Sequence, residues 1–207
     1  MLRFWKGSPI GAGTVGVLPG AFNPPTVGHE AVAAAARDQF DLGQVVFLVP
    51  EVFPHKSYEG ASLEDRIAML CAATGQEAAY AVASSREGLF IDIARQVRER
   101  YGDGIEICLI CGRDAAERIV GWDYGDGPPL RDQLKEFRLL VASREGEYVP
   151  PARYASRIQR VELAASFDEV SSSSVREAVA LGSAWRRWVN ERVAAEIDRR
   201  GLYQARE

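Results

Sequence analysis

The sequence predicts an α/β protein with a Rossmann-like parallel sheet and helices on both of its faces. Short apolar runs alternate along the chain with longer segments of helical period, an order typical of parallel strands joined by helices. Several runs are apolar at successive positions, as strands covered on both faces require. Expected strands occupy residues 14–18, 45–49, 80–83, 105–110, 137–141 and 158–163. In such a sheet, ligands bind where strand ends meet helix starts.

Six segments carry the helical pattern. They occupy residues 28–39, 62–73, 88–101, 115–120, 174–181 and 189–199. The second has Ser62 as its expected N-cap, with Asp65 three residues further on. The third carries Leu89, Ile93 and Val97 along one face.

Length and composition favour one domain. The 207 residues are 47% hydrophobic and 26% charged, as in an ordinary globular protein. We expect a single domain over residues 1–207, with a helical C-terminal part from about residue 171. Prolines and glycines interrupt residues 1–22, so this stretch is expected to be a frayed terminus that leads into a strand, not a signal peptide. Residues 124–129 and 144–151 are expected to be surface loops.

Charge and cysteine content narrow the function classes. A net charge of -4 argues against bulk nucleic-acid binding but allows small anionic ligands. No apolar run is long enough for a membrane span, so no membrane partner is expected. The three cysteines, Cys71, Cys108 and Cys111, suit a reducing cytoplasm. Cys108 and Cys111 lie three apart on an expected strand, so they should face opposite ways as buried thiols.

The stretch GAFNPPTVGH, between the first expected strand and the first expected helix, is typical of a phosphate site. Gly20 has no Cβ and lets the backbone approach a ligand. Pro24 and Pro25 stiffen the loop. Thr26 and His29 then lie at a helix N-terminus, where free N–H groups and the dipole favour an anion. Their spacing allows both side chains to face the same phosphate.

A second stretch of this kind lies far downstream. Residues 171–174 are four serines that precede a helix, and Arg176 falls in its first turn. The serines offer N-caps and hydroxyls, and the arginine can bind phosphate oxygens in a fork. Taken alone, this stretch favours a well-capped helix with a surface arginine.

Together, the two stretches resemble the (H/T)-x-G-H and I-S-S-T-x-[IV]-R motifs of the nucleotidyltransferase superfamily. From about residue 14 to residue 203 the chain looks like bacterial nicotinate-nucleotide adenylyltransferases, down to the terminal Gly-Leu-Tyr. The resemblance implies that Thr26, His29 and Arg176 are catalytic. It also implies that the nucleotide is bound by Gly20, Ala21, Phe22, Gly28, Ser171, Ser172 and Ser173.

Further features follow the family pattern. The sequence FPHK matches a loop near the leaving pyrophosphate and implies a catalytic role for Lys56, although a solvated loop lysine is an alternative. Gly112 and Asp114 follow the fourth strand and are implied to contact the nucleotide. Asp114 is equally consistent with an N-cap of the short helix after it. Phe90 and Trp122 are the implied contacts of the acceptor's pyridine ring.

Three departures from the family pattern concern mainly the acceptor. Thr26 replaces a first histidine, which other branches of the superfamily tolerate. Pro19 and Ala21 stand where glycine and a hydroxyl residue are favoured, and residues 89–92 replace a Tyr-Thr segment. The resemblance therefore implies a retained catalytic frame and an altered acceptor pocket.

The implied reaction is direct transfer of AMP from ATP to a nicotinate or nicotinamide mononucleotide-like acceptor, with release of pyrophosphate. The acceptor phosphate, whose second pKa is about 6, needs no general base near neutral pH. Mg²⁺ is expected to accompany ATP, and no protein ligand for a metal is predicted. The alternatives are a cytidylyltransferase, an adenylyltransferase with another phosphorylated acceptor, and an inactive nucleotide-binding regulator.

Overall fold

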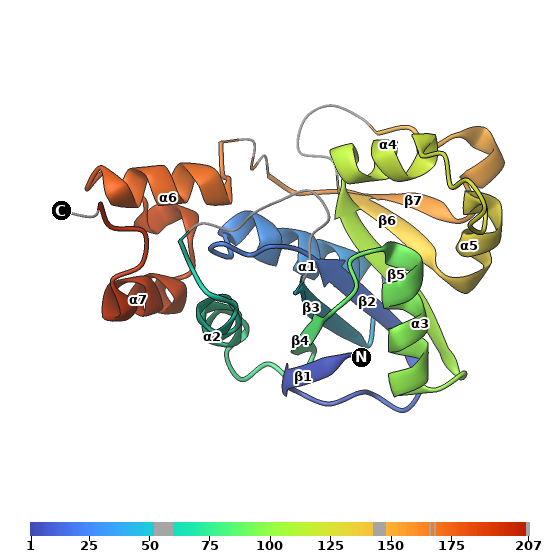
Figure 1. Ribbon diagram of the computed structural model, residues 1–207, viewed down its shortest axis with the longest axis horizontal. Coiled ribbons are helices and arrows are strands. Elements are labelled where there is room, and N and C mark those ends of the chain that lie inside the picture. Colours follow the sequence, from blue (N-terminus) through green and yellow to red (C-terminus); the bar gives the residue numbers. More distant parts are fainter. Residues whose placement is uncertain (52–59, 143–147, 166, 168, 206–207) are drawn as a thin grey trace.

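A computed structural model describes residues 1–51, 60–142, 148–165, 167 and 169–205. The strands form one seven-stranded sheet in the order β1-β4-β3-β2-β5-β6-β7. All neighbouring pairs are parallel except β1 and β4. The strands are β1 (Arg3–Lys6), β2 (Gly13–Pro19), β3 (Gln44–Pro50), β4 (Tyr80–Ser85), β5 (Ile105–Gly112), β6 (Arg138–Ala142) and β7 (Ile158–Val161). The predicted Rossmann-like α/β fold is confirmed (Figure 1).

All six predicted strands form, and the N-terminal region differs from expectation. Residues 1–22 are not merely a frayed lead into β2, because β1 pairs antiparallel with β4 at the sheet edge. Trp5 Nε1 donates a hydrogen bond to Ser84 Oγ at 3.1 Å, and the Arg3 guanidinium lies 3.8 Å from the Trp5 ring centroid. The Trp5–Ser84 bond joins β1 to β4, whereas the Arg3–Trp5 contact lies within β1.

The helices are α1 (Val27–Phe40), α2 (Leu63–Thr74), α3 (Phe90–Tyr101), α4 (Arg113–Gly121), α5 (Leu130–Glu136), α6 (Ser172–Ala180) and α7 (Glu191–Arg200), with short 3₁₀ turns η1 (Ala152–Tyr154) and η2 (Arg186–Trp188). The predicted Ser62–Asp65 capping box begins α2. The helix predicted from residue 115 begins at Arg113 with Gly112 as its N-cap, so Asp114 is not a cap. Helix α5 was not expected from the sequence.

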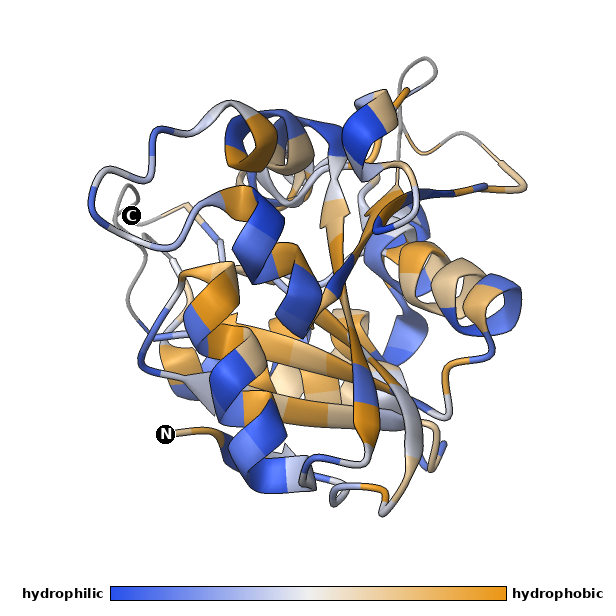
Figure 2. Ribbon diagram, turned by 90° about the vertical axis from the view of Figure 1, so that its right-hand side faces the viewer, coloured by the Kyte–Doolittle hydropathy of each residue, from blue (hydrophilic) through white to orange (hydrophobic). Residues whose placement is uncertain are grey.

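Two hydrophobic clusters cover the two faces of the sheet. One contains side chains of α3, α4 and α5, and the other contains side chains of α1 and α2. Cys111 belongs to the first cluster and Cys108 to the second, and both are buried free thiols, as predicted. Figure 2 shows the strands as predominantly hydrophobic, between helices with one hydrophobic and one hydrophilic side.

The C-terminal helices form a third cluster. Met69 of α2 packs with Val175 of α6, Val193 and Ile197 of α7, and Leu202 beyond it. Figure 1 shows α6 and α7 beside α2, away from β6 and β7. In the part of the chain that the structure describes, no helix has the length and apolar character that crossing a membrane requires.

The strand order places a topological switch point between β2 and β5. The chain runs from β2 outward to β3 and β4 on one side, and from β5 outward to β6 and β7 on the other. The carboxyl ends of these two central strands, at Pro19 and Gly112, therefore meet at one edge. In open α/β sheets, the crevice at such a point is where ligands bind.

A substitution of Gly16, in the middle of β2, tests how tightly the core is packed on the sheet face that α1 covers. A Cβ at this position would lie 2.6 Å from Leu42 Cδ1, 3.1 Å from Ile110 Cδ1 and 3.3 Å from Val45 Cγ2. We expect Gly16→Val to lower the free energy of unfolding by about 1–3 kcal/mol through overpacking, as measured by urea denaturation.

The control is Gly104→Ala, because nothing lies within 4 Å of a Cβ added there. Its effect should stay within about 0.5 kcal/mol. If Gly16→Val were as stable as the wild type, the core around β2 would have room for the added side chain, and the prediction would be wrong.

Candidate functional site

The loop from Gly20 to Thr26 connects β2 to α1 at the switch point, and Phe22 organises it. Phe22 has a φ of 47°, in the left-handed region, and is only 1% exposed. Its ring contacts those of His29 and Phe47, with centroids 5.1 and 5.7 Å away. A Cβ on Gly20 would lie 2.8 Å from Phe22 Cζ. Gly20 therefore makes room for this ring, a structural reason that the sequence did not reveal.

Thr26 and His29 interact directly at the start of α1. The Thr26 backbone N–H donates to His29 Nδ1 at 3.0 Å, and Thr26 Oγ1 lies 2.8 Å from the same nitrogen. A ring nitrogen that accepts an N–H cannot carry a hydrogen itself, so the hydrogen of a neutral His29 ring lies on Nε2. The local fold therefore fixes both the orientation and the tautomer of the imidazole.

This geometry gives Thr26 a partner other than a phosphate. Thr26 is 0% exposed, and its hydroxyl is directed at the His29 ring. The expectation that Thr26 and His29 face the same anion stays a prediction. In the structure as it stands, Thr26 acts on the histidine.

Hydrogen bonds join the serine-rich stretch to the loop from Gly20 to Thr26, although 148 or more residues separate the bonded pairs. Ser172 Oγ donates to the Pro24 carbonyl at 2.7 Å. Arg176 Nη1 donates to the Asn23 carbonyl at 2.8 Å, and its Nη2 to Ser173 Oγ at 3.3 Å. The N-termini of α1 and α6 thus meet at one place, with an arginine between them.

Ser171 has a separate role in this arrangement. It is the N-cap of α6, and its Oγ accepts a hydrogen bond from the Ser174 backbone N–H at 3.0 Å. The cap satisfies one of the free donors of the helix. The remaining N–H groups of α6 add to the positive end of its dipole.

Sequence reasoning missed two residues that hold the loop. Arg66 of α2 is 4% exposed, and its Nη1 donates to the Ala21 carbonyl at 3.1 Å. The Tyr203 hydroxyl donates a hydrogen bond to Asn23 Oδ1 at 2.7 Å. Burial raises the pKa of Tyr203, against the opposing effect of the positive charges of Arg176 and Arg66. The signal available in the sequence for such a role was an arginine at an inward-facing position of α2.

Three of the other predicted residues, Gly112, Asp114 and Trp122, lie at or after the end of β5. Gly112 is exposed at the N-cap of α4, and Asp114 is exposed in its first turn. Trp122 is 59% exposed and, with Asp114 and Arg118, lines a hollow beside α4. Phe90, the first residue of α3, packs against the core instead of lining this hollow. Lys56 lies outside the described residues.

Among the described residues, no group of three or more His, Cys, Asp or Glu side chains is placed to hold a metal ion. Mg²⁺ keeps several waters and commonly binds through substrate phosphates together with one or two carboxylates. A magnesium ion carried by a nucleotide needs no such group of side chains.

Glu30 ties the start of α1 to the start of α7. Asn190, the N-cap of α7, donates from Nδ2 to Glu30 Oε2 at 3.1 Å. The other oxygen, Oε1, is buried without a hydrogen-bond partner. Burial raises the pKa of the Glu30 carboxyl, and the bond from Asn190 partly counters it.

Comparisons with known sequences show which family the chain resembles over most of its length. A profile of the cytidylyltransferase-like family matches residues 17–178. A Gloeobacter violaceus protein named "Probable nicotinate-nucleotide adenylyltransferase" is 31% identical over 202 residues, which cover 91% of this chain and 95% of that protein. A Moorella thermoacetica protein of the same name is 31% identical over 209 residues, covering 94% and 93%.

Solved structures share the fold. The Plasmodium falciparum nicotinic acid mononucleotide adenylyltransferase complexed with NaAD superposes with a TM-score of 0.70 at 14% identity, covering 92% of this chain and 97% of that one. A structure described as a putative nicotinate-nucleotide adenylyltransferase from Vibrio parahaemolyticus gives a TM-score of 0.59 at 14% identity, covering 92% and 95%. At these identities the likeness supports the fold alone.

Glu30 makes stability depend on pH in a defined direction. Because its folded-state pKa is raised, the folded protein binds the proton more tightly, and stability falls as pH rises towards and through that pKa. Glu30→Gln keeps an acceptor for Asn190 and removes the charge. We expect the variant to melt above wild type at about pH 8 and to lose this advantage at about pH 4.

Glu64→Gln, at an exposed glutamate in the first turn of α2, is the matched control in the same thermal melts. It should show no gain at either pH. A Glu30→Gln variant that melts below wild type at both pH values would mean that the α1 dipole stabilises the carboxylate more than burial penalises it.

Proposed function

The chain belongs to the cytidylyltransferase-like family, and we propose that it transfers AMP from ATP to the phosphate of nicotinate mononucleotide and releases pyrophosphate. The observation that carries the proposal is the pair of hydrogen bonds that join Ser172 to Pro24 and Arg176 to Asn23. These bonds bring two helix N-termini and an arginine together at the switch point. Such an arrangement suits a triphosphate, because it offers N–H donors and fixed positive charge.

The chemistry needs positioning more than it needs a reactive side chain. An oxygen of the acceptor phosphate attacks the α-phosphorus of ATP. The new P–O bond forms as the bond from the α-phosphorus to the bridging oxygen breaks, and pyrophosphate carries away the electron pair. The acceptor phosphate is mostly ionised near neutral pH because its second pKa is about 6. Neither a protein nucleophile nor a general base is required.

His29 is the proposed donor to the phosphates. With Nδ1 accepting from Thr26, the Nε2–H of the neutral ring is the group that donates. A fixed donor is worth most where negative charge develops, because it needs no reorganisation during the reaction. Arg176 adds charge on the triphosphate, and Lys56 is proposed to do so at the leaving pyrophosphate.

Magnesium bound with ATP would supply further charge neutralisation on the phosphates. The protein's contribution is the orientation of the phosphates by the two helix N-termini. The ion is proposed to be held chiefly by the nucleotide and water, as Mg²⁺ commonly is.

The acceptor pocket is proposed to be less selective than in related enzymes. Ala21 offers no hydroxyl, and Leu89, next to Phe90, is 60% exposed with an apolar side chain. A site that lacks hydrogen-bond partners for a ring carboxylate discriminates less, on the order of 1–3 kcal/mol per missing group.

The proposed function is tested by measuring pyrophosphate release with ATP and each mononucleotide. We expect activity with nicotinate mononucleotide and a kcat/KM for nicotinamide mononucleotide within about 100-fold of it, the range that one or two missing polar contacts allow. CTP in place of ATP is the control for base preference. No activity with either acceptor would refute the proposal, and a strong preference for the nicotinate form would refute only the reduced selectivity.

Thr26 is proposed to act through His29, and a double-mutant cycle tests this. His29→Ala should lower kcat about 100-fold or more, the scale of one lost charge-stabilising donor. Thr26→Val should lower kcat about 2- to 10-fold with little change in the KM for ATP, and Thr26→Ser should restore it. The double variant should be no slower than His29→Ala.

If the fold-losses in kcat of the two single variants multiplied in the double variant, or if Thr26→Val raised the KM for ATP, the Thr26 hydroxyl would instead contact a phosphate. Thermal melts of each variant separate these effects from simple loss of the helix cap.

A further inference from the structure

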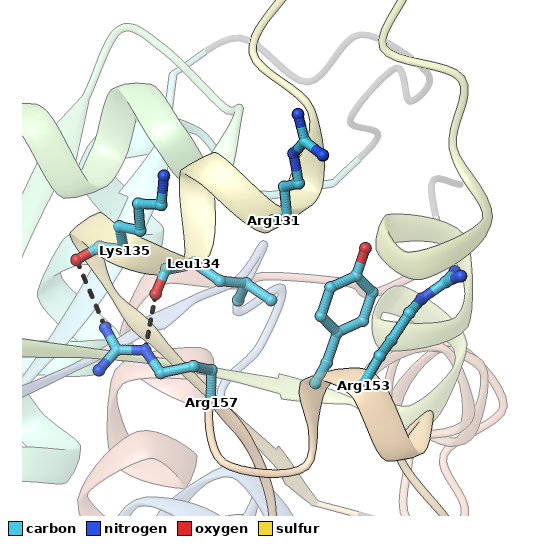
Figure 3. A pocket seen from close by; sticks show the side chains of 6 residues that line it. Arg131, Leu134, Lys135, Arg153 and Arg157 are labelled. Atoms are coloured by element: carbon cyan, nitrogen blue, oxygen red, sulfur yellow. Dashed lines mark hydrogen bonds between the residues drawn. The ribbon is translucent and has the colours of Figure 1, made fainter.

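A second basic region lies away from the site described above. Between α5, η1 and the start of β7, a hollow of about 430 Å³ is lined by Arg131, Leu134, Lys135, Arg153, Tyr154 and Arg157 (Figure 3). It adjoins the amino ends of β6 and β7, whereas the loop from Gly20 to Thr26, proposed above to bind phosphates and called the phosphate loop below, follows the carboxyl end of β2. A ligand here would not compete for space with a nucleotide at the switch point.

The charge of this hollow is strongly positive for a protein with a net charge of -4. Four of its six lining residues are cationic and none is acidic. One nearby carboxylate, Asp132, binds Lys135 Nζ at 2.7 Å and lies 3.7 Å from Arg131 Nε. It offsets part of the charge and leaves a surplus of positive groups at one place.

Hydrogen bonds to backbone carbonyls hold the Arg157 guanidinium in place at the hollow. Its Nε donates to the Leu134 carbonyl at 2.6 Å, and its Nη2 lies 3.4 and 3.3 Å from the carbonyls of Lys135 and Phe137. Figure 3 shows the guanidinium against the last turn of α5. Because these partners are neutral, the guanidinium is held in place without losing its charge. A preorganised cation loses less entropy on binding an anion.

The hollow also has an apolar side. Figure 3 shows the Leu134 side chain extending into the space between Arg157 and Arg153. The Arg153 guanidinium lies 4.9 Å from the centroid of the Tyr154 ring. An aromatic ring beside arginines can contact a sugar or base attached to a phosphate.

We propose that this hollow binds a small anion that carries a diphosphate group, independently of the nucleotidyl-transfer site. Arginine and lysine side chains match phosphate oxygens in charge and hydrogen bonding. The volume lies within the range of small-molecule sites. The acidic balance of the whole chain disfavours a long polyanion such as a nucleic acid. The diphosphate could come from inorganic pyrophosphate or from a nucleoside diphosphate.

The test is a titration of the ¹⁵N-labelled protein with inorganic pyrophosphate and, separately, with ADP, followed by amide NMR signals. We expect saturable shifts of residues in α5 and η1 that weaken as salt is added. The triple variant R131A/K135A/R153A should bind at this place at least about tenfold more weakly. Arg157 is retained in it because its bonds to α5 are structural.

The control removes the same charge elsewhere, at three exposed arginines, in R3A/R100A/R199A. It should leave the affinity at α5 and η1 unchanged. Arg176→Ala should weaken binding at the phosphate loop only, so failure of the proposed function and failure of this proposal are distinguishable. Equal losses in the two triple variants, or no saturable shift in α5 and η1 when the phosphate loop is saturated, would overturn the proposal.

Two further arms identify the source and the class of ligand. Equal affinities for pyrophosphate and ADP would support recognition of the diphosphate alone. Tighter binding of ADP that Tyr154→Ala abolishes would support a nucleoside diphosphate. Binding of hexaglutamate without binding of pyrophosphate would overturn the proposal in favour of a docking surface for acidic peptides.

Discussion

Three carbonyl oxygens of the loop between β2 and α1 hold the candidate site together, because each accepts a hydrogen bond from a side chain 45 to 153 residues away. Ala21 is paired with Arg66, Asn23 with Arg176, and Pro24 with Ser172. A carbonyl group that packing partly removes from water needs such a partner. The packing of α2 and α6 beside the loop therefore helps to hold it in this conformation.

The C-terminal helices α6 and α7 therefore contribute to the candidate site. Their core with α2 places Arg176 at the loop, and Tyr203, which follows α7, donates a hydrogen bond to Asn23. Asn190 joins the start of α7 to Glu30 of α1. A ligand that orders the loop must also stabilise these helices, because binding to the folded state alone shifts the folding equilibrium.

The sequence predicted the parallel strands and most helices because their patterns are local and strong. It failed at β1, whose four residues become a strand only by pairing with β4, some 79 residues away. It failed at α5, whose seven residues are too few to show a helical period. The two stretches that the structure brings together were both singled out in the sequence, but the contacts of Arg66 and Tyr203 with the loop were not, since they are set by tertiary packing.

Whether an arginine's charge is available to a bound anion depends on the group that the guanidinium is already hydrogen-bonded to. Arg186 and Arg200 bind the carboxylates of Asp198 and Asp65, so their charge is largely neutralised within the protein. Arg176 and Arg157 are held by carbonyl or hydroxyl oxygens, and no ion pair joins either one to a carboxylate of the described residues. Neutral acceptors fix a guanidinium in position and leave its full charge for a mobile anion. The two phosphate sites proposed for this acidic protein therefore both rely on arginines that neutral oxygens of the protein hold in place.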